Sequence, residues 1–149
     1  MGSYNQALFV VLFCWLKSIR LYNTMIIHAP ISIGELIDKI TILKIKSILI
    51  VDIIKLKNIE QELQLLEELK DSINIDIDTL EPLQSKLYGV NLELWHIENY
   101  KRECEKNQSF DDKFIETARQ VYLKNDLRAE IKHSINTMFG STIVEEKSY

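Results

Sequence analysis

The chain has 149 residues, a formal net charge of −4 and a sequence pI near 5.4. This length is enough for one domain with a real core, and the acidic balance argues against a general affinity for nucleic acid or for an anionic membrane surface. Cys14 and Cys104 are far apart and form no CxxC pair, which argues against a disulfide scaffold or a zinc site and predicts a cytoplasmic protein.

The first 24 residues differ in composition from the rest. An apolar run, ALFVVLFCWL, fills residues 7–16; it is too short for a membrane-spanning helix, which needs about 20 residues, and it lacks the flanks of a signal peptide. It is either a hydrophobic anchor or partner-binding helix, or an extension outside the fold. We favour the extension, so that residues 1–24 precede a single helical domain at residues 25–149. A membrane partner is expected only if residues 7–16 act as an anchor.

The first helix of this domain is predicted to start at Ser32. Ser32 and Glu35 have the spacing of a capping box, in which each side chain accepts from the backbone N–H of the other residue. The isoleucine-rich run that follows also suits a strand, but it does not alternate with a period of two. Apolar residues recur instead at helical steps of three and four, at Leu36, Ile40, Leu43, Ile50 and Ile54.

Two more helices are predicted next. The second runs from about Ile54 to Ser72, with Asp52 as its N-cap or as a break before it. Asp78 and Glu81 are spaced as another capping box and open the third helix, which ends near Asn107. Its apolar residues fit the a/d pattern of a coiled-coil seam, at Leu80, Leu83, Leu87, Val90, Leu94, Ile97 and Cys104. Gly89 in this helix fits either the close approach of a neighbouring helix or simple tolerance.

The last helical stretch is predicted from about Phe110 to Phe139. Its apolar stripe changes phase at Lys124, Asn125 and Asp126, so a kink or a break into two helices is expected there. The C-terminal tail is expected to be partly docked. With few glycines and prolines to interrupt them, these segments predict an all-α fold, a four- to five-helix bundle with coiled-coil-like seams.

Several blocks of the sequence resemble a family of short helical proteins of unknown function. The blocks are GELIDKITILKIK (34–46), Trp95–Glu98, VYLKND with Arg128 (121–128), and VEEKSY (144–149). The resemblance runs from about Met25 to the last residue and leaves out residues 1–24. Because that family has no assigned activity, the resemblance implies a helical fold and these boundaries, and it carries over no catalytic residue.

Acidic residues on the first helix form one candidate site. Glu35 and Asp38, at i and i+3, are neighbours on one helix face, and such carboxylate pairs can hold Mg²⁺. Glu98 and Asp126 could complete the site. This pattern predicts, as an alternative function, a magnesium-dependent nucleotide or phosphate-ester hydrolase. The simpler interpretation has Glu35 capping its helix and Asp38 pairing with a basic group, and then no metal or cofactor is expected.

A polar cluster at the phase change is the second candidate site. Such a cluster is either a buried network that fixes helix register or a ligand site, and Arg128 and Lys132 could recognise a phosphate or a carboxylate. The simpler interpretation is an ion-pair network with Asp38 and Lys39. The residues of the cluster are Tyr122, Asn125, Asp126, Arg128 and Lys132.

The chain has no P-loop, GxGxxG or HExxH motif. The first helix is apolar on more than one face, through Ile42, Ile45, Ile48, Leu49 and Ile53, and such a helix must be buried on nearly all sides. We therefore predict a protein-binding or self-assembling module without catalysis, and a homodimer as the expected assembly. Coverage of this face by residues 1–24 or by the tail of the same chain is the alternative.

Overall fold

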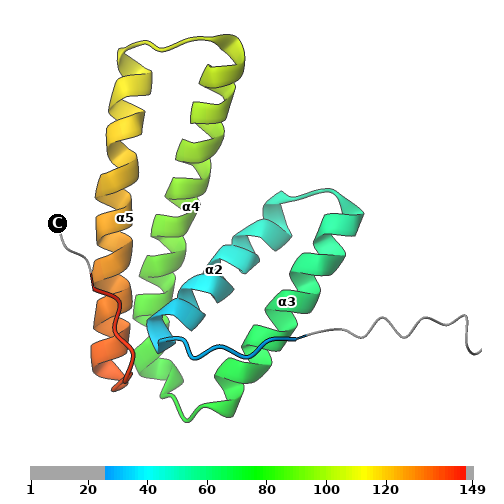
Figure 1. Ribbon diagram of the computed structural model, residues 1–149, viewed down its shortest axis with the longest axis vertical. Helices are drawn as coiled ribbons and strands as arrows, with labels where there is room; N and C mark the ends of the chain where they lie inside the picture. Colours follow the sequence, from blue (N-terminus) through cyan, green and yellow to red (C-terminus); the bar gives the residue numbers. More distant parts are fainter. Residues whose placement is uncertain (1–25, 147–149) are drawn as a thin grey trace, which may run out of the picture.

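The computed structural model describes residues 26–146, and within this range the chain forms four helices and no strand. The helices are α2 (Ile33–Leu49), α3 (Ile53–Ser72), α4 (Ile77–Asn107) and α5 (Asp112–Met138). Figure 1 shows α4 and α5 as a long antiparallel pair, with α2 against their lower half and α3 on the far side of α2. The predicted all-α bundle is confirmed. The expectation about residues 1–24 lies outside the described residues.

The central helix is α2. It packs against α3, α4 and α5, whereas α3 packs against no other described helix than α2. The apolar residues of α2 are buried along most of its length, at Leu36, Ile37, Ile40, Leu43 and Ile45. From Leu36 to Ile45, the predicted wide apolar surface of this helix is therefore covered largely by the other helices of the same chain. Beyond that point Ile48 and Leu49 are exposed.

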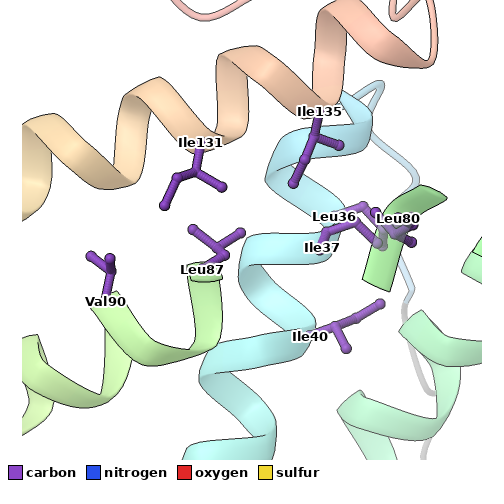
Figure 2. Packing of buried hydrophobic residues seen from close by; sticks show 8 residues of the cluster. All are labelled: Leu36, Ile37, Ile40, Leu80, Leu87, Val90, Ile131 and Ile135. Carbon is purple, nitrogen blue, oxygen red and sulfur yellow. The ribbon is translucent and has the colours of Figure 1, made fainter. Parts of the chain in front are cut away.

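The hydrophobic core lies where α2 meets the α4–α5 pair. Figure 2 shows Ile131 and Ile135 of α5 pointing toward α2 and toward Leu87 of α4. Burying side chains of this size contributes about 1.5–3 kcal/mol each, so this cluster joins three helices. Its members include part of the predicted a/d stripe of α4; they are Leu36, Ile37, Ile40, Leu80, Leu87, Val90, Ile131 and Ile135.

Side-chain caps fix the starts of three helices. Ser32 Oγ accepts from the backbone N–H of Glu35 at 3.1 Å, and Asp52 Oδ1 accepts from that of Ile54 at 2.9 Å. At the start of α5, the Asp111 side chain accepts from the backbone N–H of Phe114. Each such cap stabilises its helix by about 1 kcal/mol. The helix starts predicted at Ser32 and near Asp52 are confirmed.

The predicted start of α4 is wrong. The helix begins at Ile77 after the N-cap residue Asp76, so Asp78 and Glu81 lie inside the helix and cannot form a capping box. The reason is that the first intrahelical hydrogen bond already runs to the Asp76 carbonyl, from the N–H of Leu80 at 3.1 Å. The start therefore falls two residues earlier than the spacing of Asp78 and Glu81 suggested.

Of the predicted kink or break in the last helix, the break into two helices is wrong, because α5 runs unbroken through Lys124–Asp126. Its apolar stripe changes phase there because its neighbours change. The half of α5 after the phase change packs against both α2 and α4, and Ile131 and Ile135 join the core with both. A change of packing partners shifts the buried face of a continuous helix without breaking its backbone hydrogen bonds.

Candidate functional site: a buried polar network between α2, α4 and α5

The interface of α2 with α4 and α5 contains a buried carboxylate, Asp38, which is only 1% exposed. Arg128 of α5 binds it with two nitrogens: Nε donates to Oδ1 at 2.8 Å, and Nη2 donates to Oδ2. Asn91 of α4 donates from Nδ2 to Asp38 Oδ1 at 2.8 Å and to Thr41 Oγ1 at 2.9 Å. The Thr41 hydroxyl donates to the Asp38 carbonyl at 2.7 Å. One carboxylate of α2 is thus bound by side chains of both α4 and α5.

The electrostatics of this pair hold Arg128 in its charged form. The hydrogen bond with Asp38 raises the pKa of Arg128; burial of the guanidinium opposes this rise, and the charges of Asp38, Glu35 and Glu145 reinforce it. Two-pronged pairing of a planar guanidinium with a carboxylate also fixes the relative orientation of both side chains. The pair therefore sets the register between α2 and α5.

A second ion-pair group lies one turn further along α5. Lys132 Nζ donates to Glu35 Oε2 at 2.7 Å and also pairs with Glu145 of the C-terminal tail. Burial lowers the pKa of Lys132, but its hydrogen bonds with Glu145 and Glu35 outweigh burial, so the pKa is raised. This contact agrees with the predicted partial docking of the tail, which runs back beside α5 in Figure 1.

Only half of the predicted capping box forms, because the Glu35 side chain binds α5 instead of the Ser32 N–H. Ser32 does accept from the backbone N–H of Glu35. The Glu35 carboxylate, in contrast, binds Lys132, and the described residues contain no hydrogen bond from the Ser32 N–H to it. The Lys132 side chain is only 9% exposed, and a charged ammonium group forms a stronger hydrogen bond with a carboxylate than a neutral N–H does.

α2 and α5 approach each other closely at Gly34. Its backbone N–H donates to Asn136 Oδ1 at 2.7 Å, so a side chain of α5 satisfies one of the N–H groups that the first turn of a helix leaves unpaired. A Cβ on Gly34 would lie 2.6 Å from the carbonyl oxygen of Lys132 and 2.9 Å from Asn136 Oδ1. A residue without Cβ is required at this contact.

Two of the predicted site residues lie apart from these groups. Lys39 pairs with Glu62 of α3 at 2.7 Å, so the predicted network is wrong in including Lys39. Glu98 pairs with Lys101 on its own helix at 3.2 Å. Both pairs are partly solvated.

The remaining predicted residues meet at one cavity. A volume of about 530 Å³ lies between α5, the start of α2 and the tail, and Glu145 lines it on the tail side. Tyr122 is exposed there. Asn125 donates from Nδ2 to the carbonyl of Val121 at 2.9 Å. The predicted residues that line this cavity are Glu35, Tyr122, Asn125, Asp126, Arg128 and Lys132.

The geometry does not suit a magnesium ion on Glu35 and Asp38. Each carboxylate is already bound to a cationic side chain, and Mg²⁺ would have to displace both ion pairs to gain its oxygen ligands. Among residues 26–146, no group of three or more His, Cys, Asp or Glu side chains could hold a metal ion. No observation therefore favours the alternative of a magnesium-dependent hydrolase.

Several residues of the network were missed by the sequence patterns. Asn91 follows Val90 in the apolar stripe of α4, and Asn136 follows Ile135 in that of α5. An amide beside a buried stripe was a usable signal, because buried amides need partners. Glu145 gave no such signal, since it follows no helical repeat.

The fold and this interface define an all-α protein whose central helix is fixed by a buried network of charged and amide side chains. A family model described as a family of unknown function (DUF6165) matches residues 27–149. The chain belongs to this family, as the resemblance predicted. A search of curated proteins and a search of solved structures each found no match.

None of the helices between residues 26 and 146 combines the length and the apolar composition that a membrane crossing requires.

Proposed function

We propose that the protein is a self-associating binding module without catalysis, and that two copies pack through the outer face of α3. The observation that carries this proposal is the position of α3, which packs against no other described helix than α2. Its inner face buries Ile59. Its outer face leaves Ile54, Leu65 and Leu69 exposed by 78%, 44% and 45%.

These exposed residues share one stripe of the helix. Positions 54, 58, 61, 65 and 69 follow steps of three and four, which place them on one face. The polar side chains of Asn58 and Gln61 lie between the apolar ones on this face. Three aliphatic residues at the α2–α3 turn are also exposed, namely Ile48, Val51 and Ile53.

The charges beside this stripe favour a second copy of the same chain as the partner. Lys57 lies near the start of α3 and Glu68 near its end, both exposed and on the same side of the stripe. An antiparallel pair of α3 helices, with its two-fold axis between positions 61 and 62, places Ile54 beside the partner's Leu69. The same axis places Lys57 near the partner's Glu68. A two-fold interface must be self-complementary in this way.

Charge reversal in the full-length chain tests this arrangement. Lys57→Glu and Glu68→Lys each place like charges opposite one another, and each should weaken the dimer about tenfold. The double variant restores opposite charges and should recover wild-type association. Sedimentation velocity over a range up to tens of micromolar measures the dissociation constant of each protein.

Lys86→Glu is the matched control, because it makes the same charge change on an exposed position of α4. It should leave the dissociation constant unchanged. A wild-type chain that stays monomeric throughout the concentration range contradicts the proposal and favours coverage of the α3 face by the same chain. A double variant that associates no better than the single variants contradicts the antiparallel arrangement.

A further inference from the structure

A second cavity, of about 420 Å³, opens beside the Asp38–Arg128 pair on the side of α4. Small-molecule sites have volumes of about 300–1,000 Å³ and combine apolar walls with a few placed polar groups. This cavity has both. Its apolar wall comes from α2 and α4 and consists of Ile42, Ile45, Leu94 and Trp95.

Asn91, which lines this cavity, has a side-chain acceptor that no described residue uses. The residue is 5% exposed, and Nδ2 donates to Asp38 and to Thr41. These two bonds fix which way the amide faces, because a carboxylate accepts only and the Thr41 hydroxyl gives its own proton to a carbonyl. No described residue donates to Asn91 Oδ1.

Asn91 Oδ1 is not fully enclosed, since no side-chain nitrogen or oxygen in the described residues is both fully enclosed and without a partner, and Asn91 lines the cavity. An acceptor in a largely buried amide is stabilised by a donor. A ligand in the cavity that carries an N–H or O–H group can supply that donor.

The polar wall of the cavity is cationic. Arg102 is exposed and lies one turn beyond Glu98 on α4, and no described residue forms an ion pair with it. Arg128 binds Asp38 through Nε and Nη2, and its Nη1 lies 3.5 Å from Asn125 Oδ1. The guanidinium therefore retains further N–H donors. The one acidic residue in the wall, Glu98, is already paired with Lys101.

We propose that this cavity binds a small amphipathic anion: a ligand with an aromatic or short aliphatic body, one N–H or O–H donor, and a carboxylate or phosphate group. The body lies against Leu94 and Trp95, the donor meets Asn91 Oδ1, and the anionic group binds Arg102 together with the spare N–H groups of Arg128. No residue of α3 lines the cavity, so this site is separate from the proposed surface of self-association.

Calorimetric titration of the full-length chain tests the site with probes that separate these features. Hippurate carries a phenyl ring, one N–H and a carboxylate, and phenyl phosphate carries a ring and a phosphate. Acetate and inorganic phosphate supply the head groups alone, and benzamide supplies the ring and N–H without charge. At least one of hippurate and phenyl phosphate should bind at least about tenfold more tightly than its head group and than benzamide.

Substitutions then locate the binding. Arg102→Gln should weaken the better probe about tenfold, and Glu98→Gln should strengthen it, because the first removes a positive charge beside the anion and the second removes a negative one. Arg119→Gln is the matched control, since Arg119 pairs with Glu116 on α5 at 3.6 Å and does not line the cavity. Arg102 is exposed, so its replacement leaves the fold intact, and a melting curve checks this.

Two results overturn the proposal. One is that neither hippurate nor phenyl phosphate binds more tightly than acetate, inorganic phosphate and benzamide. The other is that Arg102→Gln and Arg119→Gln bind the better probe equally well.

Discussion

At the scale of single residues, the burial of Asp38 has an energetic cost that its neighbours offset. Removing a carboxylate from water costs several kcal/mol in a protein interior, and removing its partner afterwards leaves an uncompensated charge. Here Arg128 and Asn91 supply three hydrogen bonds to the carboxylate oxygens. The network is therefore stabilising only while it is complete.

Asp38→Asn should lower the free energy of unfolding by about 3 kcal/mol, at the low end of the range for broken buried pairs. The low end applies because the Arg128 side chain is 27% exposed and keeps some contact with solvent. Chemical denaturation gives the value. Lys39→Gln is the control on the next residue: it breaks a solvated pair with Glu62 and should change stability by less than about 1 kcal/mol. Equal effects of the two variants would show that Asp38 is not a structural centre.

The sequence indicated which charged residues would take part in this network, but not which residue pairs with which. Asp38, Arg128 and Lys132 were all expected to be polar residues with partners on other helices. Lys39 was grouped with them, although one residue along a helix turns the side chain by about 100° and brings it toward α3. Periodicity gives the face of a helix on which a residue lies, but not the neighbour that covers this face.

At the scale of helices, Gly34 and Gly89 differ in whether the neighbouring helix leaves room for a Cβ atom. Gly34→Ala should destabilise the protein by about 1–3 kcal/mol, because its Cβ would meet the backbone of α5 and force α2 away from it. Gly89→Ala should stabilise it by up to about 1 kcal/mol, because no atom lies within 4 Å of the added Cβ and alanine favours the helix. Thermal melting compares the two. A neutral Gly34→Ala would mean that α2 and α5 pack more loosely than the structure shows.

The helix boundaries show which signals act locally. The starts at Ser32 and Asp52 were predictable, because each cap is a contact within three residues. The start of α4 was missed because Asp76 and Asp78 are both good N-cap residues two positions apart. The unbroken course of α5 was missed because its apolar phase depends on packing partners that are distant in the sequence. Gly89 fits mere tolerance, since a Cβ there would meet nothing.

At the scale of the whole molecule, Lys132 links α2, α5 and the tail through its charge. Its pKa in the folded protein is raised above the usual 10.5, so its stabilising effect is complete below that pH and is lost as the pH rises through the folded pKa. Lys132→Gln should cost about 1–2 kcal/mol at pH 8, and this difference from the wild type should shrink well above pH 10.5. Denaturant titrations at both pH values measure it.

Lys44→Gln serves as the comparison for Lys132→Gln, because Lys44 pairs with Glu67 at 3.0 Å where both side chains are about a third exposed. Its effect at pH 8 should stay below about 1 kcal/mol. A Lys132→Gln deficit that is the same at both pH values would mean that packing of the side chain, and not its charge, carries the effect.

The position of α2 between all the other described helices has a consequence for how the molecule opens. The α4–α5 hairpin pairs two helices that are adjacent in the chain, and such local contacts form early and survive partial unfolding. α3 has less support, because α2 is the only described helix whose backbone lies close to that of α3. Loss of α2 from the core therefore releases α3 with it, while the hairpin keeps its own pairing. The element that carries the proposed surface of self-association is then the one that detaches most readily, so a second copy bound to α3 would slow the first step of unfolding.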